Sequence, residues 1–276
     1  MKAWMALTGE DSLQLIRIRD DCFGYADMND GFLRLIVIDG NFESDFFRLA
    51  DAFLEGGGVL LDVGANYGLL SCGLAGRHSE NVEFHLFEPN AGLIPSIRRS
   101  VALYPSMRCQ INCSAVSDRV GTVVFAIDET QSGASHISEG SGAAVQSTTI
   151  DHYLDEEGID TVALLKVDVE GYELAALRGA RRSLERKRIR AIYFEYFEKL
   201  LVRVAPPAEL LALFDAVGYE VCFCRAANLE RHGRDLRTIR KGLAGHGLPL
   251  QPVKAFAIPA MTDLLAVPKE DLVPAS

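Results

Sequence analysis

The stretch LLDVGANYGLLS, residues 60–71, decides the fold of this chain. A short apolar run ends at Asp62 and Val63, a tight turn is flanked by Gly64 and Gly68, and a helical stretch follows. A turn of this kind brings backbone N–H groups close to a ligand, and glycine permits that close approach. The stretch therefore predicts a strand, a ligand-binding turn and a helix, which is the plan of a Rossmann-type site.

The spacing of this turn favours a cationic ligand over a phosphate. A dinucleotide site has the pattern G-x-G-x-x-G, whereas Gly64 and Gly68 give G-x-x-x-G. Asp62 lies two residues before the first glycine, where a carboxylate would repel a pyrophosphate and attract a positive charge. The enzymatic alternative, an NAD-dependent oxidoreductase on a Rossmann fold, predicts a third glycine and no acid at this position.

Strand-like and helix-like segments alternate on both sides of the turn. Further strands are expected at VEFHLFEP (82–89), MRCQINCSAVS (107–117), VALLKVDVEG (162–171) and IRAIYFEYF (189–197), with helices at 93–103 and 173–184. This alternation predicts βαβ units with right-handed crossovers. YEVCFC (219–224) and DLLAVP (263–268) are expected to complete the sheet as a terminal pair. The expected fold is α/β and Rossmann-like, with a mostly parallel sheet, helices on both faces and an antiparallel terminal strand.

The chain is expected to form one globule. Residues 1–45 contain two strand-like runs and are interpreted as an N-terminal cap packed on the main domain, 46–276. An insertion around 225–260 is rich in Arg, Gly and Pro, and the small polar segment 131–147 is the best candidate for a mobile loop.

Composition excludes several functional classes. The 276 residues are 49% hydrophobic and 24% charged, which is typical of a globular protein. The formal charge of −10 gives no electrostatic footprint for nucleic acid. No run approaches the roughly 18 apolar residues of a membrane span. The first fifteen residues lack the pattern of a signal peptide, and the six cysteines have no zinc spacing, so we expect reduced thiols and a cytoplasmic protein.

Two further strand ends supply candidate ligand contacts. Glu88 ends the second strand, where an acid can accept hydrogen bonds from two ribose hydroxyls; the alternative is a solvated surface residue. Ser114 and Ala115 end the third strand and leave room for a flat base, although they are equally compatible with ordinary strand-end positions.

KVDVEGYE (166–173) supplies the candidate catalytic groups. Asp168 and Glu170 are two residues apart, so in extended backbone they face the same side, and both are candidates for general-base or substrate-orienting work. Asp168 is the first candidate base, whereas the alternative for Glu170 is a role at the start of the following helix. His136, on the polar segment, is the second candidate base, and its alternative is a solvated histidine. A carboxylate pair could hold Mg²⁺, but nothing beyond these two residues supports a metal, and none is predicted.

The sequence resembles the FkbM-type methyltransferases over roughly residues 40–199. The motifs that carry this resemblance are LLDVGANYG, FEPN, INCSAVSD and LLKVDVEGYELAALRGA. The resemblance implies a class I methyltransferase fold, S-adenosylmethionine as donor, and usually O-methylation of a hydroxyl on a sugar, polyketide or other secondary metabolite. Family members often carry His where this chain has Tyr172. The resemblance implies that the methionine side of the donor is bound by Asp62, Gly64, Asn66 and Gly68. It implies that Glu88 binds the ribose. The full predicted set of cofactor contacts is Asp62, Gly64, Ala65, Asn66, Gly68, Glu88, Ser114 and Ala115.

The expected partner is thus a small-molecule substrate, with no nucleic acid and no membrane span. A nucleic-acid methyltransferase is disfavoured by the acidic charge and by the lack of an Asn-Pro-Pro-aromatic stretch. A non-catalytic, methyltransferase-like binding protein is the remaining alternative. The sequence does not determine the oligomeric state, for which a homodimer is one alternative.

Overall fold

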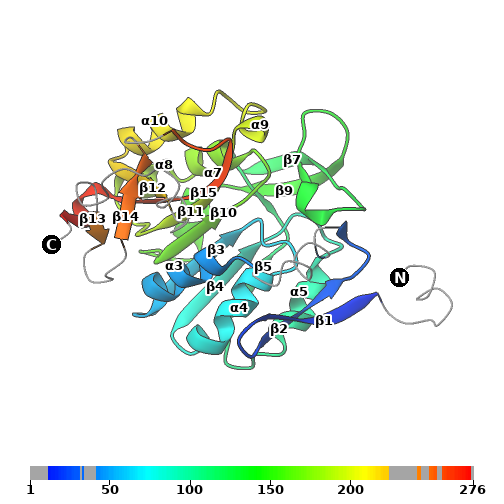
Figure 1. Ribbon diagram of the computed structural model, residues 1–276. Coiled ribbons are helices and arrows are strands. Elements are labelled where there is room, and N and C mark those ends of the chain that lie inside the picture. Colours follow the sequence, from blue (N-terminus) through cyan, green and yellow to red (C-terminus); the bar gives the residue numbers. More distant parts are fainter. Residues whose placement is uncertain are drawn as a thin grey trace.

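A central sheet organises the computed structural model, which describes residues 12–31, 33, 42–223, 241–243, 249–253 and 257–274 (Figure 1). Its strands within these residues are β3 (Gly58–Val63), β4 (Val82–Phe87), β5 (Cys109–Asn112), β10 (Leu164–Val167), β11 (Ile192–Phe197), β12 (Tyr219–Phe223), β13 (Lys241–Leu243), β14 (Pro249–Pro252), β15 (Met261–Pro268) and β16 (Leu272–Pro274). Their order is β16-β13-β14-β12-β15-β11-β10-β3-β4-β5.

The central strands of the sheet are parallel, and antiparallel strands extend it on the β11 side. β5, β4, β3, β10 and β11 pair in parallel, whereas β15 runs antiparallel to both β11 and β12. The predicted α/β fold, with a mostly parallel central sheet and an antiparallel terminal strand, is confirmed, and the antiparallel part continues beyond that strand. Because the parallel strands are covered on both faces, their sequences are continuously apolar rather than alternating.

Helices cover both faces of the sheet, as Figure 1 shows. One face carries α3 (Ser44–Leu54), α4 (Leu69–His78) and α5 (Ile94–Val101), and the other carries α6 (Ile150–Glu156), α7 (Glu173–Arg178), α8 (Arg181–Glu185) and α10 (Ala208–Ala216). Successive residues of β3 point to opposite faces. Leu60 therefore packs with the α3–α5 core, while Leu61 packs with the core beneath α6, α7, α8 and α10.

A second, small sheet lies at the carboxyl edge of the main sheet. Its strands are β6 (Ala115–Val116), β7 (Gly121–Ala126), β8 (His136–Ile137) and β9 (Ala143–Thr148), in the order β6-β9-β7-β8. The single strand expected at 107–117 is thus divided between two sheets, as β5 and β6. The segment 131–147 forms the 3₁₀ turn η1 (Ser132–Ala134), β8 and most of β9, because β7 offers an edge that its small residues can pair with.

An N-terminal hairpin packs beside α4 and α5. It consists of β1 (Leu13–Arg19) and β2 (Cys22–Asp27), paired antiparallel. The backbone N–H of Tyr25 donates to Ser100 Oγ at 2.8 Å, and a Cβ at Gly24 would lie 2.7 Å from Leu69 Cδ2, so the contact with α4 is close. All of the second expected N-terminal strand, at 32–40, except Leu33 falls outside the described residues, as does most of the expected insertion at 225–260.

None of the helices within the described ranges has both the length and the apolar character that crossing a bilayer requires.

Candidate active site at the carboxyl edge of the sheet

A cavity of about 1090 Å³, its open mouth included, lies at the carboxyl ends of β3, β4, β10 and β11. Most of the predicted site residues line it: Gly64, Ala65, Asn66, Glu88, Ser114, Ala115, Asp168 and Glu170. Three predicted residues, Asp62, Gly68 and His136, are not in its described lining. The topology thus brings together motifs that are about 100 residues apart in the chain.

The turn after β3 forms the floor of the cavity. The backbone N–H groups of Gly64 and Ala65 both donate to Phe87 O at 3.0 Å, which ties the turn to β4. Gly64 has a φ of 78°, and a Cβ built on it would lie 1.8 Å from Asp168 O. No side chain fits there, so glycine is required by the close approach of two strand ends as well as by its backbone conformation. Gly68 lies behind the turn, facing Ile97 and Leu86.

Glu88 joins the turn to the end of β4. Its side chain is 6% exposed, and its two carboxylate oxygens accept hydrogen bonds from the backbone N–H groups of Asn66 and Asn90, each at 2.8 Å. Burial raises the pKa of Glu88 to about 7, despite these two backbone donors. The carboxylate still borders the cavity, and its remaining lone pairs can accept hydrogen bonds from a ligand.

Asp62 lies behind the cavity wall, where a buried lysine matches its charge. Asp62 is 1% exposed and accepts a hydrogen bond from Ser71 Oγ at 2.7 Å. Lys166 Nζ lies 3.3 Å from Asp62 Oδ1 and 3.5 Å from Asp168 Oδ2, and it donates to Gly64 O at 2.6 Å. Any influence of Asp62 on a ligand is therefore indirect, through Lys166 and the turn.

Lys166 was not recognised in the sequence, although a charged residue within the apolar run VALLKV is a signal. It is 3% exposed, on β10, in register with Asp62 on β3. Burial opposes its charged form, but Asp168 and Asp62 outweigh burial and raise the pKa of Lys166 above its ordinary value. Lys166 therefore remains a cation at any physiological pH.

Three carboxylates form a row across neighbouring strands, which we call the acidic row: Asp168, Glu195 and Asp263. All three line the cavity. Glu195 on β11 pairs with Asp263 on β15. Val167 on β10 pairs with Phe194, so Asp168 comes next to Glu195. Glu195 and Asp263 were missed by sequence reasoning because only the sheet register places them beside Asp168.

Glu170 follows the acidic row in a strained turn. It has a φ of 54°, and Arg203 Nη1 donates to its backbone carbonyl at 2.9 Å. Burial, followed by the nearby charge of Asp168, raises the pKa of Glu170 to about 8. Glu173 closes the same turn, since its Oε1 accepts hydrogen bonds from the N–H groups of Val169 and Gly171 at 3.0 and 3.1 Å. This arrangement gives Glu173 a structural part at the start of α7.

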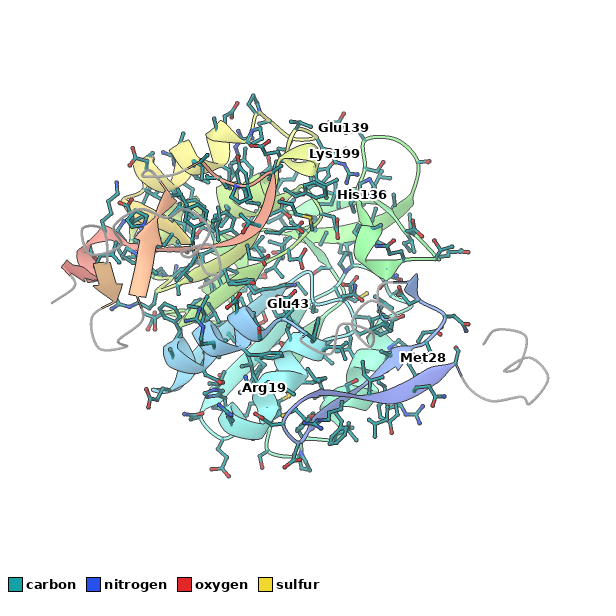
Figure 2. The ribbon with its side chains drawn as sticks, in the orientation of Figure 1. Arg19, Met28, Glu43, His136, Glu139 and Lys199 are labelled. Atoms are coloured by element: carbon teal, nitrogen blue, oxygen red, sulfur yellow. The ribbon has the colours of Figure 1, made fainter. Side chains whose placement is uncertain are left out.

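His136 faces away from the cavity. Its neighbours Ser135 and Ile137 both line the cavity, and alternate residues of an extended segment point to opposite sides. The Nδ1 atom of His136 is 2.9 Å from Ala134 O. Figure 2 labels His136 in the small sheet and Glu43, a cavity-lining residue, at the start of α3. This orientation gives no support to His136 as the base.

Residues 128–135, which we call the strap, form one wall of the cavity and are held from the N-terminal side. The N–H of Ser132 donates to both carboxylate oxygens of Asp30 at 3.2 Å. Tyr67, in the turn, donates its hydroxyl to Asp30 Oδ2 at 3.1 Å. Ser132 Oγ also donates to Asn66 Oδ1 at 3.0 Å. Asp30 thereby connects the strap, the turn and the segment that follows the hairpin.

No group of three or more His, Cys, Asp or Glu side chains with the geometry to hold a metal ion occurs within the described part of the chain.

Residues 62–221 match the family profile of the methyltransferase FkbM domain. A crystal structure of an FkbM methyltransferase from Methylobacillus flagellatus is 16% identical, with a TM-score of 0.46 and coverage of 77% of this chain and 44% of that one. A precorrin-6y C5,15-methyltransferase from Geobacter metallireducens is 13% identical, with a TM-score of 0.41 and coverage of 82% and 88%.

TYW2 from M. jannaschii, solved in complex with AdoMet, is 12% identical, with a TM-score of 0.43 and coverage of 94% of this chain and 85% of that one. No curated protein matches the sequence. This chain spans 44% of the length of the Methylobacillus protein. The profile match runs from the end of β3 to β12, over more than half of the chain, and includes the turn after β3 and Glu88. The chain therefore belongs to the FkbM methyltransferase domain family.

Proposed function

We propose that this protein transfers a methyl group from S-adenosylmethionine to a hydroxyl group of a small molecule, such as a sugar, a polyketide or another secondary metabolite. Family membership supports methyl transfer. The observation that carries the donor assignment is the carboxylate of Glu88, at the wall of the cavity and bonded to the turn at Asn66.

The cavity suits a cationic nucleoside better than a pyrophosphate. Among its described lining residues the one cation is Lys166, and its charge is already matched by Asp62 and Asp168. A pyrophosphate would therefore find no free counter-charge, whereas a sulfonium and an ammonium would meet carboxylates.

Each part of the donor has a group that would hold it. The turn residues Gly64, Ala65 and Asn66 would bind the methionine part, Glu88 would accept hydrogen bonds from the ribose hydroxyls, and small residues at the start of β6 would leave room for the adenine. When bound, the donor supplies an electrophilic methyl group. The protein would supply proximity and alignment, which are large contributions to a transfer between two bound molecules.

An alcohol acceptor must lose its proton as it attacks. The carboxylates at the ends of β10 and β11 border the space that this donor placement leaves free. Asp168, the base expected from the sequence, is among them, and it forms an ion pair with Lys166.

The proposal is tested by following a ¹³C-labelled methyl group from S-adenosylmethionine into hydroxylated small molecules by NMR. The chemical shift of a methyl carbon bonded to oxygen differs from that of one bonded to nitrogen or carbon. We expect the label on oxygen, and no label with Gly64→Ala, whose turn cannot form. Transfer to nitrogen or to carbon would contradict O-methylation, and no transfer to any acceptor would favour a binding protein.

A further inference from the structure

The middle of the acidic row is the most electrostatically crowded carboxylate in the cavity. Asp263 on β15 lies directly opposite Glu195. On the other side, the register of β10 and β11 places Asp168 next to Glu195. Side chains directly opposite in neighbouring strands lie about 5 Å apart, and like charges at that distance repel. Within the described part of the chain, no hydrogen-bond or ion-pair partner is found for the carboxylate of Glu195.

The charged surroundings of Glu195 are mainly acidic. Among the described residues, the charged groups that face it or share its cavity are Asp168, Glu170 and Glu173 from β10 and the following turn, Asp263 from β15, Glu43 from the start of α3, and Lys166. The ammonium group of Lys166 forms ion pairs with Asp62 and Asp168 and not with Glu195. Burial, followed by the charge of Asp168, raises the pKa of Glu195 to about 9. Without a bound ligand, Glu195 is therefore protonated at neutral pH.

A bound cation changes this state. A positive charge beside a carboxyl group favours its ionised form. The donor that we propose carries a sulfonium, and its ribose and methionine parts occupy the ends of β4 and β3. The space in front of β10, β11 and β15, where the acidic row lies, is left to the acceptor.

We propose, on the basis of the function above, that Glu195 is the carboxylate that takes the proton of the acceptor hydroxyl, and that the positive charge of the donor holds it ionised. As the acceptor oxygen bonds to the methyl carbon, the bond from that carbon to sulfur breaks and its electron pair stays on sulfur. The hydroxyl proton passes to Glu195. One positive and one negative charge disappear together, which a water-excluded site favours.

Asp168 is less suited to this step and acts as a positioning residue. Its carboxylate lies 3.5 Å from Lys166 Nζ, so it is engaged in an ion pair, whereas Glu195 has no such partner among the described residues. We expect Asp168 to hold Lys166 and the turn, and Glu195 to take the proton.

The test compares two ligands that differ by one charge. S-adenosylmethionine carries the sulfonium, whereas S-adenosylhomocysteine is a neutral thioether. Calorimetric titration in buffers of different ionisation enthalpy counts the protons released on binding. At neutral pH we expect wild type to release up to about one proton more with S-adenosylmethionine, because the cation ionises Glu195. Glu195→Gln should abolish that difference and still bind S-adenosylhomocysteine, which shows that the variant is folded.

Glu220→Gln is the matched control, since Glu220 is a buried carboxyl on β12 outside the described lining of the cavity, and it should behave as wild type. The proposal is overturned if Glu195→Gln keeps the proton difference, or if Glu170→Gln alone abolishes it. With an acceptor in hand, Glu195→Gln should lower kcat by about 10²- to 10⁴-fold at an unchanged KM for the donor. If wild type binds neither adenosyl ligand, the proposed function itself fails.

Discussion

At the scale of single residues, Lys166 holds the floor of the site together. Replacing it by Met would leave Asp62 buried with no opposing charge. Breaking one side of a buried ion pair costs about 3 to 5 kcal/mol, and we expect Lys166→Met to lose that much free energy of unfolding in a urea titration. Lys269→Met is the control, because its pair with Asp215 is 40% and 56% exposed and such pairs contribute about 1 kcal/mol or less. Equal losses in the two variants would refute this account of Lys166.

A second residue-scale prediction concerns glycine at the turn. Gly64→Ala would bring its Cβ to within 1.8 Å of Asp168 O, whereas Gly158, also at positive φ, has nothing within 4 Å of its Cβ position. Gly158→Ala should therefore cost only backbone strain, about 1 to 2 kcal/mol. Gly64→Ala should cost more in a urea titration and also abolish binding of S-adenosylhomocysteine. Comparable stability of the two variants would show that the close approach to Asp168 is not required.

The residues that a sequence can reveal are those in local motifs. Gly64 and Glu88 follow strands directly, so their positions at the sheet edge could be predicted. The ion-pair partner of Asp62 could not be predicted, because only the register of β3 and β10 brings Lys166 next to it. Glu195 was missed for the same reason, since its significance depends on its neighbours in β10 and β15.

At the scale of elements, the strap depends on a residue from the N-terminal segment. Asp30→Ala removes the acceptor for Ser132 N and Tyr67 OH. A hydrogen bond to a charged group contributes about 1.5 to 3 kcal/mol, so we expect the affinity for S-adenosylhomocysteine to fall roughly tenfold or more, with faster dissociation in stopped-flow measurements. Asp27→Ala, which removes a local acceptor for Asn29 N, should leave the dissociation rate unchanged. If both variants release the ligand at the wild-type rate, the strap is not held by Asp30.

Strands with a long apolar run could be predicted from the sequence, whereas the bounds of short strands could not. The strands at 82–87 and 192–197 lie within the ranges expected from the sequence. The division of 107–117 into β5 and β6 depends on the pairing of β6 with β9, and the formation of β9 by the small residues at 143–148 depends on its pairing with β7. Pairing with a distant edge overrides local propensity in such short strands.

At the scale of the whole molecule, the carboxyl groups of the cavity make stability depend on pH. Burial is the largest cause that raises the pKa of Glu88 and Glu173 to about 7, of Glu170 to about 8 and of Glu195 to about 9. A raised pKa means that the folded state holds protons that the unfolded state has lost. The contribution of these groups is complete below pH about 4.5 and is lost as pH rises through the folded values.

We therefore expect the melting temperature of the ligand-free protein to fall between about pH 6 and pH 9, measured by calorimetry. The variant Glu170→Gln/Glu195→Gln should show a smaller fall, because two of the groups no longer ionise. At acidic pH the opposite sign applies to Asp51. Burial opposes its ionisation, but hydrogen bonds from His78 and Arg19 lower its pKa to about 2, so its contribution is lost below about pH 4. A melting temperature that rises from pH 6 to pH 9 would contradict the account.

The most direct test of the central claim, that the cavity between the turn and Glu88 binds S-adenosylmethionine, is a thermal shift experiment. Wild type and Glu88→Ala are melted with S-adenosylmethionine, S-adenosylhomocysteine or NAD. At about 100 times its dissociation constant a ligand adds roughly 2.7 kcal/mol, which raises the melting temperature by roughly five to ten degrees in a chain of this size. We predict such a shift with both adenosyl ligands in wild type, a much smaller one in Glu88→Ala, and none with NAD. A shift with NAD alone, or an undiminished shift in Glu88→Ala, would contradict the claim.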